Sequence, residues 1–375
     1  LEEGKSYFVT RNGSSMIAFH LPKKDFQGFH IVASHSDSPT YRIKEQPEMS
    51  VEKHYTKLNI ERYGGMIPET WFDRPLSVAG RIIIEENGQI KDQLVNIDRD
   101  LMIIPNLAIH MSRSSNESKQ LNPQKDLLPL CGGNLTKDGF EEMIAKEAGV
   151  EKEDILSYDL FLYNRMRGTT LGINEEFVAA PKLDDLECAY SSIEGMLNAK
   201  LSKDYVTVCA VFDNEEVGSG TKQGAGSTFF PEVLKRISYL CGKNEEEYYM
   251  AVADSFMLSA DNAHAVHPNY QDKTDPTNRP YINEGIVLKY NASQKYTTDA
   301  NSAALVKYLC KKEKIKCQVF FNRSDMLGGS TLGNILTGQV SIKAADIGLP
   351  QLSMHSTYET AGCKDFSPHP AVRRL

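Results

Sequence analysis

The sequence lacks the features that mark disulfide-stapled, membrane-spanning and nucleic-acid-binding proteins. Its seven cysteines contain no Cys-x-x-Cys pair, which favours reduced thiols in a cytoplasmic protein. No apolar run approaches the roughly 18 residues that span a bilayer, and no secretory signal is visible. Lys and Arg number 42 against 50 Asp and Glu, and the resulting net charge of −8 argues against nucleic acid as a partner.

The composition that is present is that of an ordinary globular protein, with 41% hydrophobic and 25% charged residues over 375 positions. At about 150 residues per domain, this length predicts two or three domains. Apolar residues three and four apart predict helices at 186–200 and 298–312. Short apolar runs predict buried strands at 29–34, 206–212, 255–260, 286–290 and 317–321. Strands that alternate with helices favour an α/β fold, with a mostly parallel central sheet flanked by helices.

The region from 40 to 178 has a different character. It combines alternating and β-branched residues at 76–85, a turn signal at Asn87-Gly88 and an apolar stretch at 101–109. We therefore predict a β-rich domain at residues 40–178, inserted into a catalytic domain formed by residues 1–39 and 179–375.

Side chains that can bind metals or move protons follow several predicted strands. His35 and Asp37 come directly after the first strand and point the same way in an extended segment, so Asp37 is placed to orient a metal-binding His35. Asp184 and Asp185 open the helix at 186–200, where either a helix cap or a metal ligand fits the pattern.

The most apolar strand ends in a cluster of acids that contains Asp213, Glu215 and Glu216. Like charges packed at a strand end repel one another, so a partly buried arrangement needs a cation, whereas a charged turn in solvent does not. The carboxyl end of a strand is also where α/β sheets place their ligands. A binding site and a solvated turn are the two interpretations of this cluster.

Three of the histidines later in the chain are candidate ligands. Asp261 ends a predicted strand, and His264 and His267 follow with a spacing that suits either zinc binding or structural hydrogen bonds. His355 follows a late apolar stretch, where a buried structural histidine is the alternative to a ligand. The glycine-rich segment 328–333 lacks the Lys and Ser or Thr of a phosphate loop, so nucleotide binding is not predicted.

Taken together, these residues predict a centre for two divalent metals. Each cation can take one histidine and carboxylate oxygens, with one carboxylate shared, a donor set that suits zinc, or manganese or cobalt in its place. Three carboxylates and a bridging hydroxide neutralise two dications, as a partly buried site requires. The candidate residues come from the ends of predicted strands and the start of one helix: His35, Asp184, Glu215, Glu216, Asp261 and His355.

In their order along the chain, these motifs resemble the aspartyl aminopeptidase family of co-catalytic zinc metallopeptidases. The matching stretches are HSDSP (35–39), KLDDL (182–186), DNEEVGS (213–219), SADNAHAVHPNY (259–270) and PQLSMHS (350–356). The resemblance implies that the protein removes N-terminal residues, above all Asp and Glu, from peptides. It also implies that the inserted domain mediates dimerisation and that the protein is a homo-oligomer, a tetrahedral dodecamer built from dimers.

The same resemblance implies a ligand set for each metal. One metal would be held by His35, Asp184 and Asp261. The other would be held by Asp184, Glu216 and His355, so that Asp184 bridges the two.

Further roles follow from the resemblance and from the chemistry that it implies. Glu215 would be the general base, and Asp37 would orient the histidine beside it. His110 would complete the active site of a neighbouring subunit as a donor to the developing oxyanion. An acidic first residue needs a cation in its pocket, for which Lys289 is preferred over Arg323.

This chain departs from the family pattern in two respects. Asp185 stands where the family usually has Asn, and the added charge can shift the metal preference. The family pattern also begins further upstream, so we expect an N-terminal segment to be missing. Two alternative functions remain open at this point. One is another dinuclear-metal hydrolase, a carboxypeptidase or a deacylase, and the other is a non-catalytic assembly protein, against which the intact Glu215 argues.

Overall fold

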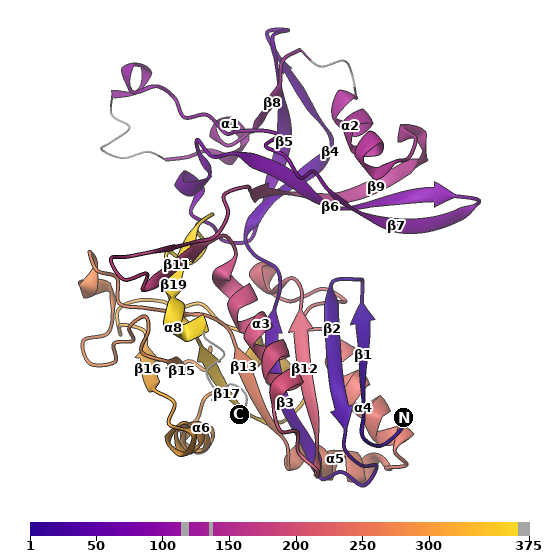
Figure 1. Cartoon of the computed structure of the whole chain (residues 1–375), viewed down its shortest axis with the longest axis vertical. Helices are drawn as coiled ribbons and strands as arrows, with labels where there is room; N and C mark the ends of the chain where they lie inside the picture. Colours follow the sequence, from indigo (N-terminus) through magenta and orange to yellow (C-terminus); the bar gives the residue numbers. More distant parts are fainter. Residues whose placement is uncertain (114–119, 135–137, 367–375) are drawn as a thin grey trace. The chain divides into compact units, whose positions relative to one another are not determined.

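The computed structural model describes residues 1–113, 120–134 and 138–366, and the chain divides into two compact units (Figure 1). The first unit comprises Leu1–Ser38, Thr169–Met354 and the chain from Glu359 onward. The second comprises Pro39–Gly168 and His355–Tyr358. The first unit has two sheets and the second has one, and each unit has its own buried core.

The first unit is built around a mixed eight-stranded sheet. Its strands, in spatial order, are β1 (Lys5–Arg11), β2 (Ser15–Leu21), β12 (Tyr205–Phe212), β3 (Gly28–His35), β13 (Phe256–Ala260), β17 (Lys343–Gly348), β15 (Ile286–Tyr290) and β16 (Cys317–Phe321). The neighbours from β12 to β17 run parallel, as do β15 and β16. The pairs β1–β2, β2–β12 and β17–β15 are antiparallel.

The sequence explains why the centre of this sheet is buried. β12 is an almost continuous apolar run, which is typical of a parallel strand covered on both faces. On one face, Cys209 and Val211 of β12 pack with Ala189 of α3 (Leu183–Asn198). On the other face, Val208 and Ala210 belong to the large core that also contains α4 (Phe229–Leu240), α5 (Glu245–Ala253) and α7 (Leu332–Gln339). Figure 1 shows α3 lying across β3 and β12.

A smaller sheet completes the first unit. Its five strands are β10 (Thr169–Leu171), β11 (Phe177–Ala180), β19 (Glu359–Gly362), β18 (Pro350–Leu352) and β14 (Ala263–His264). Two further helices are α6 (Ala300–Glu313) and the short α8 (Cys363–Phe366). The helix α6 begins with a capping box at Asp299, one residue after the Thr from which the sequence predicted it to start.

The second unit contains a six-stranded antiparallel sheet. The order is β7 (Gln89–Asn96), β6 (Leu76–Glu86), β9 (Ile155–Asn164), β4 (Thr40–Val51), β5 (Tyr55–Tyr63) and β8 (Leu130–Gly132). Two helices, α1 (Pro123–Asp126) and α2 (Gly139–Ala148), accompany it. Asn87 and Gly88 form the predicted turn between β6 and β7, and both have positive φ. The stretch 101–109 forms isolated bridges at 102–104 and is irregular at 105–108, rather than one strand.

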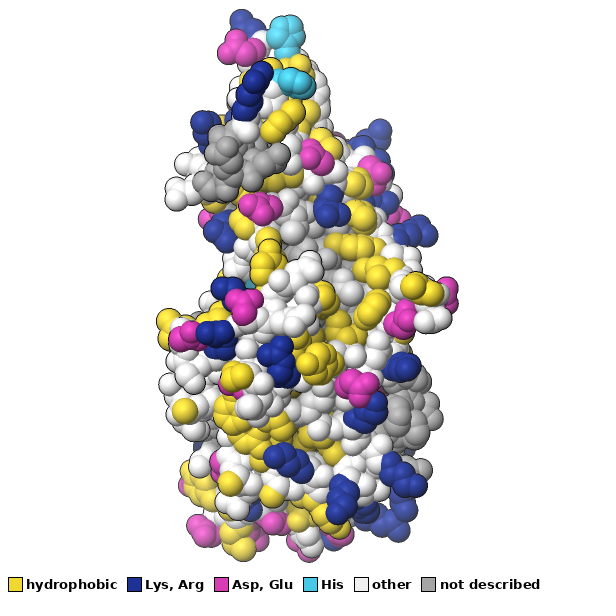
Figure 2. Space-filling view, turned by 90° about the vertical axis from the view of Figure 1, so that its left-hand side faces the viewer, with side chains coloured by type: hydrophobic (Ala, Val, Ile, Leu, Met, Phe, Trp, Pro, Cys, Tyr) yellow, Lys and Arg dark blue, Asp and Glu magenta, His cyan; other side chains and the backbone are white. Residues whose placement is uncertain are grey.

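The five strands predicted from apolar runs are present as β3, β12, β13, β15 and β16, with bounds that differ by at most one residue. Within the described ranges, no helix is both long and apolar enough to cross a membrane. On the face drawn in Figure 2, acidic and basic side chains are interspersed with hydrophobic ones, so the charge there is of both signs.

Candidate metal centre

The candidate metal centre forms where parallel strands of the large sheet end. His35 is the last residue of β3 and pairs in register with Phe212, the last residue of β12. On the other side of β3 lies β13, and Asp261 follows its last residue. Because neighbouring parallel strands end at one edge of a sheet, the segments that follow them emerge close together. The two acidic strand-end motifs of the chain therefore flank His35.

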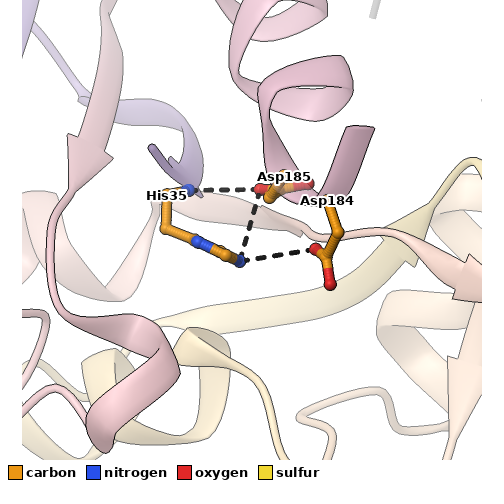
Figure 3. A group of neighbouring side chains, drawn as sticks. All are labelled: His35, Asp184 and Asp185. Atoms are coloured by element: carbon orange, nitrogen blue, oxygen red, sulfur yellow. Dashed lines mark hydrogen bonds and ion pairs between the residues drawn. The ribbon is translucent and has the colours of Figure 1, made fainter. Parts of the chain in front are cut away.

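The start of α3 brings two more carboxylates to this edge. Asp184 and Asp185 have non-helical backbone angles, and the peptide bond between them is cis. Lys182, which precedes α3, makes no side-chain capping bond, and the regular part of the helix begins after the two aspartates. Instead, Oδ2 of Asp185 accepts a hydrogen bond from the backbone N–H of His35 at 3.1 Å (Figure 3). The backbone N–H of Asp184 donates to Oε2 of Glu359 at 2.9 Å.

The imidazole of His35, which is 1% exposed, has carboxylates near both ring nitrogens. Its Nδ1 lies 3.3 Å from Oδ1 of Asp37 and 3.1 Å from the main-chain oxygen of the same residue. Its Nε2 lies 3.7 Å from Oδ1 of Asp184, 4.0 Å from Oδ2 of Asp185 and 4.0 Å from Oε2 of Glu215. Two donor atoms that share one zinc ion are roughly 3–4 Å apart, because each lies about 2 Å from the metal. The spacing around Nε2 is therefore the spacing of metal ligands rather than of direct hydrogen bonds.

Asp37 also fixes the turn that carries the two glutamates. Its Oδ1 accepts a hydrogen bond from the backbone N–H of Glu215, and its Oδ2 accepts one from Glu216, both at 3.1 Å. The turn is sharp because Asn214 adopts a φ of 62°, a left-handed conformation that Asn tolerates well. Asp37 thus contacts both the ring of His35 and the backbone of the glutamate turn.

The residues present fit a divalent metal. His35 with Asp184 and Asp185, and His35 with Glu215 and Glu216, each offer donor atoms that lie within 4.8 Å of one another. Imidazole nitrogens and carboxylate oxygens are the donors that zinc, manganese and cobalt accept in proteins.

The electrostatics of the cluster also call for a cation. Burial, followed by the charges of neighbouring carboxylates, raises the pKa of Glu215 to about 7 and that of Glu216 to about 10. The pKa of Asp185 lies well above its ordinary value, with burial again the largest cause. Burial acts to lower the pKa of His35, but the surrounding carboxylates outweigh it and raise that pKa. A dication would supply the opposite charge and return the carboxyl groups to their ionised form.

Asp261 is held by a buried lysine. Nζ of Lys289, on β15, donates to the main-chain oxygen of Asp261 at 2.8 Å and lies 3.3 Å from its Oδ1. The same ammonium donates to the main-chain oxygen of Asn262 at 3.1 Å. Lys289 is 2% exposed. An ammonium has three donors, and protein oxygens stand at all three contacts, so this geometry favours a structural role over the predicted contact with a substrate carboxylate.

Two of the predicted site residues belong to the second unit. His110 is exposed and lies in a short 3₁₀ turn, η2 (Ile109–Met111). His355 begins the segment His355–Tyr358, and its main-chain oxygen accepts a hydrogen bond from the N–H of Ile67 at 3.0 Å. The intersubunit role of His110 and the metal role of His355 stay predictions.

The other histidine and arginine candidates have local partners. His264 lies in the short strand β14, and the Nδ1 of His267 accepts a hydrogen bond from the N–H of Asn269 at 3.1 Å, so this pair does not share a helical face. Arg323 forms an ion pair with Asp325 at 2.7 Å in the same surface loop. These contacts favour structural roles.

Sequence reasoning missed a group of buried polar residues behind the cluster. Glu187 is 1% exposed, and its Oε2 accepts a hydrogen bond from Nδ2 of Asn262 at 2.7 Å. Burial raises the pKa of Glu187 to about 8. Glu187 and Asn262 lie next to motif residues, which is a signal that could have found them. Glu359, on β19, lies three residues beyond the motif at 350–356, and no pattern in the sequence marks it.

Comparison with known proteins identifies the family. The family model described as aminopeptidase I zinc metalloprotease (M18) matches residues 1–372. A probable M18 family aminopeptidase 2 from Clostridium novyi (strain NT) is 47% identical over 376 residues, which cover 97% of this chain and 86% of the relative. The protein of the same name from Pseudomonas aeruginosa (strain UCBPP-PA14) is 38% identical over 374 residues, with 98% and 86% covered.

Solved structures agree with this result. The cryo-EM structure of the Ape4 and Nbr1 complex matches with a TM-score of 0.95 at 37% identity, covering 100% of this chain and 76% of that chain. The crystal structure of prApe1 matches with a TM-score of 0.92 at 28% identity, covering 99% and 83%. The structure of the S. cerevisiae mApe1 dodecamer matches with a TM-score of 0.85 at 28% identity, covering 99% and 84%.

These matches extend over nearly the whole chain and name aminopeptidases. They decide in favour of a metallo-aminopeptidase over the carboxypeptidase, deacylase and non-catalytic alternatives that the sequence left open. The chain belongs to the M18 family of aminopeptidase I zinc metalloproteases.

Proposed function

We propose that this M18 aminopeptidase removes N-terminal residues, Asp and Glu above all, from peptides with the help of two divalent metals per subunit. Zinc is the proposed metal, with manganese or cobalt as substitutes. One observation supports the metal centre most directly. Nε2 of His35 faces carboxylates from two separate segments, the start of α3 and the turn after β12, at distances of 3.7–4.0 Å.

In this proposal the metals share one carboxylate. His35, Asp184 and Asp261 would hold the first metal, and Asp184, Glu216 and His355 would hold the second. When bound, two such cations would supply Lewis acidity, which polarises a carbonyl and lowers the pKa of a water molecule to near 7. The backbone hydrogen bond from Asp184 to the buried Glu359 supports its bridging role, because it fixes the segment from which that carboxylate projects.

Glu215 is proposed as the general base. Its Oε2 lies 4.0 Å from Nε2 of His35, and its backbone is anchored to Asp37, so the carboxylate is held beside the proposed ligands. A carboxylate in this position can take the proton of the attacking water at Oε2 and pass it to the leaving amine. Asp37 acts through His35 and Glu215, as the residue that orients both.

The proposed assembly is a tetrahedral dodecamer in which the second unit mediates dimerisation. Support comes from the dodecamer that a structural relative forms and from the exposed turn around His110. Leu107, Ile109 and Met111 in this turn are 54%, 47% and 76% exposed, an apolar surface that suits contact with another subunit. In the assembly, His110 would reach the active site of a neighbour and donate to the developing oxyanion.

A substrate screen tests the proposed function. Metal-free protein is given zinc, manganese or cobalt in turn, together with reporter substrates that carry different first residues. We expect hydrolysis to require added metal, to be fastest for Asp and Glu, and to be absent for reporters with an acetylated α-amine. Equal rates for acidic and neutral first residues would remove the acidic preference, and turnover without metal would remove the metal centre.

A further inference from the structure

Lys289 is an unusual residue for the interior of a sheet. It lies on β15, between β17 and the edge strand β16, and its side chain is among the largest fully buried side chains of the described residues. A buried charge must be paired, because removing an ammonium from water costs several kcal/mol. The nearest acceptors are the two oxygens of Asp261 and the main-chain oxygen of Asn262, at 2.8, 3.3 and 3.1 Å. The ammonium of Lys289 therefore binds the turn that follows β13.

The same turn is also tied to α3. The amide of Asn262 donates from Nδ2 to Oε2 of Glu187 at 2.7 Å, and its Oδ1 lies 3.3 Å from Sγ of Cys188. Glu187 and Cys188 lie in the first regular turn of α3, directly after Asp184 and Asp185. Asn262 thus connects the segment that carries one proposed ligand to the segment that carries another.

The contact between Lys289 and Asp261 offsets the repulsion between two buried carboxylates. Asp261 and Asp184 are both buried carboxyl groups whose like charges repel, whereas Lys289 places the opposite charge 3.3 Å from Oδ1 of Asp261. Without a fixed cation, the two carboxylates would be driven apart in the metal-free protein. Asp346, which is also on the sheet near Lys289, is already bound by the hydroxyls of Thr297 and Thr331, at 2.7 and 2.5 Å. Because Asp346 has these other donors, the ammonium of Lys289 can pair with Asp261.

We propose that Lys289 and Asn262 are positioning residues that hold Asp261 in place against the start of α3 and so preorganise the metal centre. This inference rests on the proposed function, because it takes Asp261 as a metal ligand. It differs from a substrate-binding role for Lys289, because it requires an effect on the metal when no peptide is present.

The test is a titration of the metal-free, full-length protein with zinc ions, without substrate. Lys289→Met removes the ammonium while keeping the length of the side chain. Because the loss of a group that orients a metal ligand typically weakens metal affinity about 10- to 100-fold, we expect a loss of that size. Lys316→Met is the matched control, because Lys316 pairs with Glu284 at the surface. We expect it to bind zinc as the parent does.

Two further variants keep the test informative. Asn262→Ala keeps the main-chain oxygen that contacts Lys289 but removes the link to α3, so we expect a smaller loss of zinc affinity in a variant that folds as judged by circular dichroism. Asp261→Asn removes the proposed ligand itself and should lose affinity most. The absorption spectrum of the cobalt-loaded protein provides a second readout, which should change in Lys289→Met and not in Lys316→Met.

The possible outcomes separate the two proposals. If Asp261→Asn binds zinc as tightly as the parent, the ligand assignment in the proposed function fails, and this inference fails with it. If Asp261→Asn loses affinity while Lys289→Met and Asn262→Ala do not, the positioning role alone is overturned. Unchanged zinc affinity in Lys289→Met together with a raised KM for acidic reporters only would also overturn it, in favour of a substrate contact.

Discussion

The backbone N–H of His35 donates to Oδ2 of Asp185, and both residues are buried. One oxygen of this carboxylate thus holds the strand end that carries a proposed metal ligand. Asp185, which stands where the family usually has Asn, therefore has a structural role in addition to its charge. An Asn at this position offers the same acceptor without the charge, so the two contributions can be separated by substitution.

Asp185→Asn should keep the hydrogen bond to His35 and fold at least as stably as the parent when metal is absent, because it removes one of several like charges. Its affinity for zinc should be lower, since the cluster is less negative. Asp185→Ala should lower the free energy of unfolding by about 1–3 kcal/mol, because it leaves a buried N–H without an acceptor. Denaturant unfolding of the metal-free proteins measures the difference. Equal stability of the Ala and Asn variants would contradict the structural role.

Glu215→Gln should retain the metal content of the parent and lose the chemical step. The amide keeps the shape of the side chain but cannot accept a proton, and general-base catalysis contributes about 10²–10⁴-fold to a rate. The measurement pairs kcat on an aminoacyl reporter with metal content by elemental analysis. Asp213→Asn, on the same turn, is the control and should stay active. Near-normal turnover in Glu215→Gln would remove this residue from the role of base.

The strands and the acidic motifs could be predicted from the sequence because their signals are local. The run from 206 to 212 is apolar apart from Thr207, and His35, Glu215 and Glu216 follow runs of this kind within four residues. Once strands are parallel neighbours, their ends must share an edge, so the convergence of His35 with Glu215 follows from topology.

Other features depended on tertiary contacts that leave no local pattern. From the sequence, Lys289 is only a cation at the end of an apolar run. The fold shows that its ammonium donates to Asp261 and Asn262. Glu359 is found by its bond to the backbone of Asp184, which is distant in sequence. The antiparallel hairpin of β1 and β2, at one edge of the large sheet, was not predicted either, although its signal is local.

His355→Ala should lose about one equivalent of metal per subunit, because the proposal gives His355 to one of two metals and a zinc site that lacks one of its few ligands binds poorly. Elemental analysis of protein purified without chelator provides the count. His267→Ala is a suitable control, since its Nδ1 makes only a local contact within the described residues, and it should keep the metal content of the parent. An unchanged metal-to-protein ratio in His355→Ala would exclude it as a ligand.

If His110 acts in a neighbouring subunit, two inactive variants should complement each other. His110→Ala keeps its own general base, and Glu215→Gln keeps its own His110, so a mixed assembly contains some sites in which both groups are intact. Co-expressed chains with different tags, purified through both tags, should recover part of the parent activity. His54→Ala is a control for the loss of a histidine elsewhere in the second unit and should be active alone. Failure of the mixed assembly to recover any activity would argue against shared sites.

Glu187 should make the stability of the metal-free protein fall as pH rises. Burial raises its pKa from 4.5 to about 8, so between these values the folded state holds a proton that the unfolded state has released. Stability is therefore full below the unfolded pKa and is lost as pH rises towards the folded pKa. Glu187→Gln keeps an acceptor for Asn262 and has no proton to release, so its unfolding free energy should fall less between about pH 5 and about pH 8. Denaturant unfolding of both proteins at the two pH values tests this, and identical pH dependence would show that Glu187 does not titrate in that range.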